Sequence, residues 1–137
     1  MWVTLCAALA TGSLPDLVAI VGNPGKDDAE IIARDLDTYR DYWLHRGLAA
    51  SKVLVAKWKS PAESAAFAAK LRASMTKTAA GRLAIFVSGH GVPIQESDKT
   101  WIPAMSFENG SATYSWKALF AELAIPAEWR ALVVPDT

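Results

Sequence analysis

The chain is poor in the residues that build metal and disulfide sites, and neither charge sign is in excess. Its 137 residues include one cysteine and two histidines, and 14 Lys and Arg balance 14 Asp and Glu. A single cysteine excludes an internal disulfide framework and a Cys-based zinc site. Two histidines leave little room for a His-rich metal site. Zero net charge argues against non-specific binding to nucleic acid and against a polybasic contact with a membrane.

Long hydrophobic runs are also missing. The longest, residues 2–10, has about half the ~20 residues that a membrane span needs, so we expect no transmembrane helix. Residues 8–10 have the small-x-small form of a signal cleavage site, but no Lys or Arg precedes the apolar run. We therefore interpret residues 1–16 as an N-terminal extension or a signal remnant. The compartment stays open, with the cytoplasm favoured over secretion, and Cys6 is expected to be a buried or half-buried thiol.

What the chain does have is enough apolar residues for one packed domain. Hydrophobic residues make up 52% of it, and its length suits a single domain with a real core. Four short apolar runs, the first of them rich in β-branched residues, predict strands that are buried on both faces, as in a parallel sheet. These predicted strands are residues 17–21, 53–56, 83–87 and 131–134, and residues 22–25 are predicted to be a loop.

Three helices are predicted between these strands. In residues 27–46, Ile32, Leu36, Tyr39 and Trp43 recur at helical spacing, and Gly47 is a C-cap candidate.

The second helix begins with the cap residue Ser60, Pro61 in the first turn and Glu63 to complete a capping box, and it runs to about residue 76. Its predicted buried stripe is Phe67, Leu71 and Met75. The third helix is predicted over 114–123, with Trp116, Phe120 and Leu123 on one face, after a polar excursion that could form a small hairpin.

This alternation of strands and helices predicts a fold and a location for the site. It favours a three-layer α/β/α sandwich with a mainly parallel four-stranded sheet, with the first strand in its interior. Functional residues of such sheets lie at the carboxyl ends of the strands. Two segments qualify: residues 88–91 after the third strand and residues 135–137 after the fourth. We expect them to lie close together.

His90 is the strongest candidate for chemistry in the first of these segments. It stands between two glycines at the end of a buried strand, and histidine is the commonest general base. The alternative is a solvent-exposed loop histidine. His45, near the end of the first helix, is expected to be exposed and without a functional role. The acidic residues of that helix, Asp27–Asp28 and Asp35–Asp37, are most simply solvated helix faces, and no phosphate-binding loop, dinucleotide fingerprint or nucleophile elbow is present.

The segment Phe86-Val87-Ser88-Gly89-His90-Gly91 resembles the histidine motif of the caspase-like cysteine peptidases, which include caspases, metacaspases and, more distantly, legumain-type enzymes. The resemblance extends from residue 17 onward. It includes the Asp28-Ala29 pair at the first helix, residues 99–103 after the histidine, and the closing residues 130–137. Residues 17–137 would accordingly form an incomplete caspase-like domain.

The resemblance implies catalytic roles for two residues. His90 would protonate the leaving amine, and the backbone N–H of Gly91 would help to hold the oxyanion. In the family the last strand leads into Asp-x-Cys, whose cysteine is the nucleophile. Asp136 and Thr137 match its first two positions, and Cys6 does not match the third. We therefore expect this polypeptide to be inactive alone, as part of a truncated or cleaved protein, with a natural pseudoenzyme the less favoured explanation.

The same resemblance suggests the substrate. Ser88, Asp136 and Asp28 match positions that receive a basic P1 side chain in metacaspases, and a carboxylate there suits Arg or Lys. The expected partners are a polypeptide substrate and a second fragment that carries the catalytic cysteine. Neither a cofactor nor a metal is implied, and neither a nucleic acid nor a membrane is an expected partner.

Two other functions stay open at this point. One is a pseudopeptidase or peptide-binding module that keeps the same fold. The other is an unrelated flavodoxin-like receiver or binding domain, in which the Gly-His-Gly sequence is incidental. A receiver would have acidic clusters at several strand ends, whereas this chain offers only Asp27, Asp28 and Asp136.

Overall fold

The structure of the chain, a computed structural model, describes residues 13–24, 27–107 and 112–136. The expectations for Cys6, for most of the N-terminal extension and for Thr137 concern residues outside this described part.

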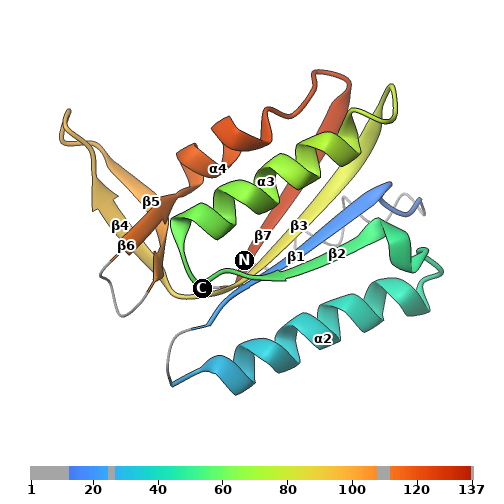
Figure 1. Ribbon diagram of the computed structural model, residues 1–137, viewed down its shortest axis with the longest axis horizontal. Helices are drawn as coiled ribbons and strands as arrows, with labels where there is room; N and C mark the ends of the chain where they lie inside the picture. The colour runs from blue at the N-terminus through green and yellow to red at the C-terminus, as the bar shows by residue number, and fades with distance from the viewer. Residues whose placement is uncertain (1–12, 25–26, 108–111, 137) are drawn as a thin grey trace.

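A four-stranded parallel sheet forms the centre of the molecule (Figure 1). Its strands are β1 (Leu17–Asn23), β2 (Val53–Lys57), β3 (Gly81–Gly89) and β7 (Trp129–Asp136), in the order β2-β1-β3-β7. All three neighbouring pairs are parallel. The four predicted strands and the interior position of the first are confirmed.

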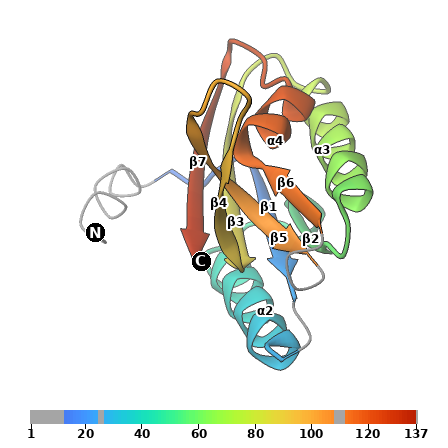
Figure 2. The same cartoon turned by 90° about the vertical axis from the view of Figure 1, so that its left-hand side faces the viewer.

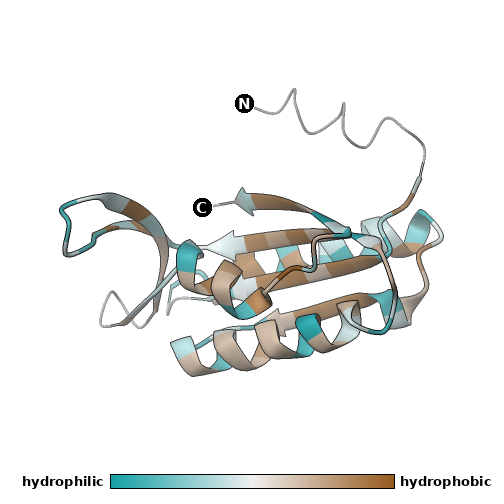
Figure 3. Cartoon of the chain, turned by 90° about the horizontal axis from the view of Figure 1, so that it is seen from above, coloured by the Kyte–Doolittle hydropathy of each residue, from teal (hydrophilic) through white to brown (hydrophobic). Residues whose placement is uncertain are grey.

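Helices cover both faces of this sheet, which makes the molecule an α/β sandwich. Helix α2 (Ala29–His45) packs on one face, and α3 (Pro61–Met75) and α4 (Trp116–Leu123) lie on the other. A short 3-10 turn, Ala50–Lys52, leads from α2 into β2. Figure 3 shows that hydrophobic residues run along the strands of this sheet. Alternate residues of the two interior strands face opposite helices: Ala19 and Ile85 join the α3–α4 core, and Ile20 and Phe86 join the α2 core.

Helix α2 lies very close to β1. Ile32, Leu36 and Trp43 of the predicted stripe are buried, and the half-buried ring of Tyr39 stacks on Phe86 with 5.0 Å between centroids. The approach depends on Gly22, because a Cβ there would lie 2.6 Å from Cγ2 of Ile32.

The predicted loop at 22–25 is wrong at its start. Strand β1 continues through Gly22 and Asn23, both buried, because these residues pair with Ser88 and Gly89 of β3.

Helix α3 begins as the sequence predicts. The Ser60 hydroxyl accepts the backbone N–H of Glu63 at 3.3 Å, and Pro61 occupies the first turn. The Glu63 carboxylate accepts the backbone N–H of Lys59 at 2.7 Å, one residue earlier than a capping box requires. The predicted stripe of Phe67, Leu71 and Met75 is buried.

Helix α4 differs from its prediction at the start and in its buried face. It begins at Trp116 because Ser115 caps it, accepting the backbone N–H of Ala118 at 3.0 Å. Tyr114, predicted to be helical, is a buried strand residue. The buried face carries Leu119 and Leu123, whereas Phe120 is 41% exposed.

The polar excursion forms a second, antiparallel sheet beside the first (Figure 2). It contains β4 (Gly91–Gln95), β5 (Trp101–Phe107) and β6 (Ala112–Ser115), so the hairpin anticipated from the sequence is present. Its inner end packs on the main core through Met105 and Phe107.

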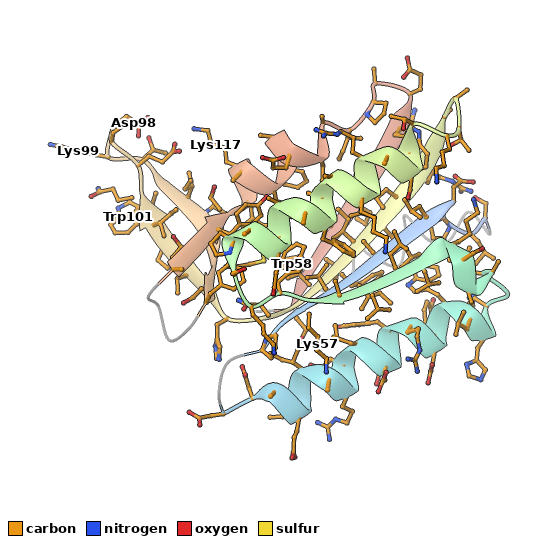
Figure 4. All side chains as sticks on the ribbon, viewed as in Figure 1. Lys57, Trp58, Asp98, Lys99, Trp101 and Lys117 are labelled. Carbon is orange, nitrogen blue, oxygen red and sulfur yellow. The ribbon has the colours of Figure 1, made fainter. Side chains whose placement is uncertain are left out.

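The far end of the hairpin is polar and exposed. Figure 4 shows Asp98, Lys99 and Trp101 there, away from Trp58 at the end of β2. Lys117 bonds both carboxylate oxygens of Glu96 at 2.9 Å, and this contact raises the pKa of the lysine. The pKa of Asp98 is lowered, chiefly because its carboxylate accepts the backbone N–H of Thr100. The contact between Lys117 and Glu96 joins the hairpin to α4, and the contact between Asp98 and Thr100 lies within the hairpin turn.

Candidate functional site

The carboxyl ends of β1, β3 and β7 meet at one edge of the main sheet. Asn23 is level with Gly89, and Ser88 is level with Asp136. Figure 2 shows the arrowheads of these strands at that edge. His90 follows β3 directly, so the two predicted segments at 88–91 and at the end of β7 do lie on neighbouring strands.

His90 is exposed and bonded to an acidic residue of α2. Its side chain is 65% exposed, and Nε2 lies 2.6 Å from Oδ2 of Asp28. Asp28 is the N-cap residue of α2, yet its side chain makes no capping hydrogen bond. An N-cap carboxylate ordinarily accepts a backbone N–H from the first turn of its own helix. Here that carboxylate bonds the imidazole instead.

A second contact joins the same two elements. The Ser88 hydroxyl, in a residue that is 3% exposed, donates to Oδ2 of Asp35 at 2.9 Å. Asp35 is half-buried and lies seven residues, about two helical turns, after Asp28. One face of α2 therefore bonds two positions at the end of β3.

The main chain around His90 is held by the second sheet and by β1. The carbonyl of His90 accepts the backbone N–H of Ser106 at 3.0 Å. The buried side chain of Asn23 donates to the carbonyl of Ser106. Gly89 permits this convergence, because a Cβ there would lie 2.7 Å from Cβ and 2.8 Å from the carbonyl oxygen of Asn23. The His90 backbone is therefore bonded to β5, and β5 is bonded in turn to the end of β1.

Not all the predicted residues are equally accessible. Gly91, the first residue of β4, is exposed. Ser88 is buried and already bonded, and Asp136 is the last residue of β7 in the register. His45 is exposed, as predicted, with Nδ1 2.7 Å from the carbonyl of Asp41.

The interpretation of the acidic residues of α2 as solvated faces is wrong for two of them. Asp28 and Asp35 bond His90 and Ser88, whereas Asp27 and Asp37 are exposed. Asp35 was missed as a site residue. The signal was its seven-residue spacing from Asp28, which places both on one helical face beside the buried Ile32.

The arrangement places one exposed imidazole, bonded to a carboxylate, at the carboxyl ends of the strands of a parallel sheet. Compared with known proteins, the chain matches no protein-family model and no curated protein. Within the described ranges, no three His, Cys, Asp or Glu side chains gather closely enough to hold a metal ion. In the same ranges, no helix is long and apolar enough to cross a membrane.

Proposed function

We propose that these residues form the histidine-bearing part of a caspase-like cysteine endopeptidase. The observation that supports this most strongly is the exposed His90, bonded to Asp28, at the carboxyl edge of the sheet beside the end of β7. Parallel α/β sheets carry their functional residues at that edge. A histidine backed by a carboxylate is a recurrent acid–base arrangement in acyl transfer.

The proposed reaction proceeds by covalent catalysis. A cysteine thiolate attacks the scissile carbonyl carbon, and the carbonyl electron pair moves to oxygen, where the backbone N–H of Gly91 stabilises it. His90 gives a proton to the amine nitrogen as the C–N bond breaks, which leaves a thioester. Water then attacks the thioester as His90 takes one of its protons. The C–S bond breaks, and the carboxylic acid and the cysteine thiolate are released, which leaves His90 protonated as at the start.

The nucleophile belongs, in this proposal, directly after Thr137. The resemblance to the family's Asp-x-Cys sequence assigns it there. The register supports the assignment: Ser88 is level with Asp136, so a strand that kept this register would bring the residue after Thr137 level with His90. The 137 residues have only Cys6, so the proposal requires a cysteine from outside them.

The proposed substrate is a polypeptide cleaved after Arg or Lys. In the resemblance, Asp136 and Ser88 belong to the group that receives the P1 side chain. A carboxylate at that position favours a guanidinium or ammonium group over an aspartate.

The direct test is a peptidase assay on a chain extended past Thr137 by a cysteine and the strands that complete the sheet. Two fluorogenic peptides that differ only in Arg or Asp at P1 are the substrates. We expect turnover of the Arg peptide, abolished by an alkylating agent and by His90→Ala, because removal of one member of a catalytic pair costs several orders of magnitude in rate. His45→Ala is the matched control, and it should retain full activity.

Each alternative function gives a different result. Peptide binding without turnover in the extended chain would indicate a pseudopeptidase and contradict the proposal. Turnover that His90→Ala leaves unchanged would contradict the mechanism. Preference for the Asp peptide would overturn the substrate assignment alone.

A further inference from the structure

The contact between Asp28 and His90 gives the carboxylate a role different from the P1-binding role that the family resemblance suggests. Oδ2 of Asp28 is 2.6 Å from Nε2 of His90, and the Asp28 side chain is only 20% exposed. Its other oxygen, Oδ1, has no contact with solvent and no hydrogen-bond partner among the described residues. One oxygen is thus bonded to the imidazole and the other is covered, so neither is presented to a substrate.

The contact also determines where the imidazole carries its hydrogen. A carboxylate oxygen accepts hydrogen bonds and does not donate them, so Nε2 of His90 is the protonated nitrogen. In a neutral imidazole the other nitrogen, Nδ1, is then the proton acceptor. With the side chain 65% exposed, the ring can meet a reacting group.

We propose that Asp28 is a positioning residue, which holds His90 as the Nε2–H tautomer and leaves Nδ1 as the atom that exchanges protons with the nucleophile and the leaving amine. This inference rests on the proposed function for its catalytic meaning. The pairing and the tautomer are properties of the 137-residue chain itself.

The segments that carry Asp28 and His90 are each held by a further hydrogen bond, as a positioning role requires. On the helix side, Asp35 accepts the Ser88 hydroxyl at 2.9 Å and holds the first turns of α2 against β3. On the strand side, the Ser106 N–H bonds the His90 carbonyl at 3.0 Å. Preorganisation of this kind makes an orienting carboxylate effective, because the imidazole does not have to be reoriented during the reaction.

The first experiment measures the tautomer by long-range ¹H–¹⁵N correlation of the His90 ring, at about pH 9, well above the ordinary imidazole range. We expect one protonated nitrogen, Nε2, in the unaltered chain and a mixture of tautomers in Asp28→Ala. Asp28→Asn should retain Nε2–H, because its amide oxygen can accept the same hydrogen. Asp27→Ala removes a neighbouring exposed carboxylate and should leave the ring signals unchanged. Identical tautomer populations in the unaltered chain and in Asp28→Ala would overturn the proposal.

The second experiment separates positioning from P1 binding in the cysteine-containing extended chain. A positioning role predicts that Asp28→Ala lowers kcat by about tenfold or more, equally for substrates with Arg or with norleucine at P1, and leaves KM nearly unchanged. A loss confined to the Arg substrate and expressed in KM would contradict it. If the extended chain has no activity at all, the proposed function fails, and the ring spectra still decide the pairing of Asp28 with His90.

Discussion

The conformation of Tyr114 is determined by its tertiary contacts rather than by its sequence neighbours. The helical spacing of Trp116, Phe120 and Leu123 led to a helix predicted from Tyr114 onward. In the structure Tyr114 is 8% exposed, and its ring packs edge-on against Trp58 at 6.3 Å. Its hydroxyl is buried and has no hydrogen-bond partner within the described ranges. Burial, with a smaller effect from the charge of Glu122, raises the pKa of Tyr114 above its ordinary value of 10.0.

This raised pKa predicts how Tyr114 contributes to stability at high pH. The folded state favours the neutral phenol, so the contribution is fully present below pH 10 and is lost as the pH rises through the folded-state pKa. We expect Tyr114→Phe to change the free energy of unfolding little at neutral pH, since an unpaired buried hydroxyl is removed. Above pH 10, the free energy of unfolding of Tyr114→Phe should exceed that of the unaltered chain by an amount that increases with pH.

The measurement is urea unfolding of both proteins between neutral and alkaline pH. The exposed Tyr42 gives the matched control, Tyr42→Phe, which should follow the unaltered chain at every pH. A stability difference between Tyr114→Phe and the unaltered chain that stays constant above pH 10 would contradict the burial account.

At the scale of elements, helix starts and buried stripes could be predicted from the sequence where local capping and periodicity control them. Helix α3 is the clearest case: Ser60 and Pro61 set its start, and Phe67 and Leu71 lie in its core. Element ends were harder to predict when long-range partners set them. Strand β1 extends beyond its predicted end to Asn23, because that residue pairs with Gly89 of β3, 66 positions later. Such distant pairing leaves no periodic signal in a single sequence.

The contact between α2 and β3 gives a prediction at this scale. Ser88 and Asp35 join the two elements through one partly buried hydrogen bond to a carboxylate, a class of bond worth about 1.5–3 kcal/mol. We expect Ser88→Ala and Asp35→Ala each to destabilise the fold. Because both remove the same bond, the double variant should be less destabilised than the sum of the two, with a coupling of about 1 kcal/mol or more.

Denaturant unfolding of the four proteins in this cycle gives the coupling directly. A parallel cycle on the exposed pair Asp37 and Arg40, which is 3.0 Å apart, should give a coupling of about 0.5 kcal/mol or less. Additive effects of Ser88→Ala and Asp35→Ala would show that the bond does not hold α2 against β3.

At the scale of the whole molecule, the sheet and the position of His90 at the carboxyl ends of its strands could be predicted, but the side-chain arrangement there could not. Alternation of strands and helices was enough to place His90 near the end of β7. The partners of His90 depend on how α2 is rotated and how far it lies along the sheet. Those variables are set by tertiary packing, in particular by the close approach at Gly22. Asp28 was consequently assigned only by resemblance, and Asp35 was overlooked.

The proposed function requires that His90 activates a thiol at the end of β7. The decisive measurement is the alkylation rate, near neutral pH, of a chain that carries a cysteine and two glycines after Thr137, with Cys6→Ser to leave a single thiol. An adjacent imidazole should lower the pKa of the thiol and raise the rate about tenfold over an unstructured cysteine peptide. His90→Ala should remove this enhancement, and His45→Ala should preserve it. An alkylation rate equal to that of the free peptide, and unchanged by His90→Ala, would show that His90 does not activate a thiol at this position.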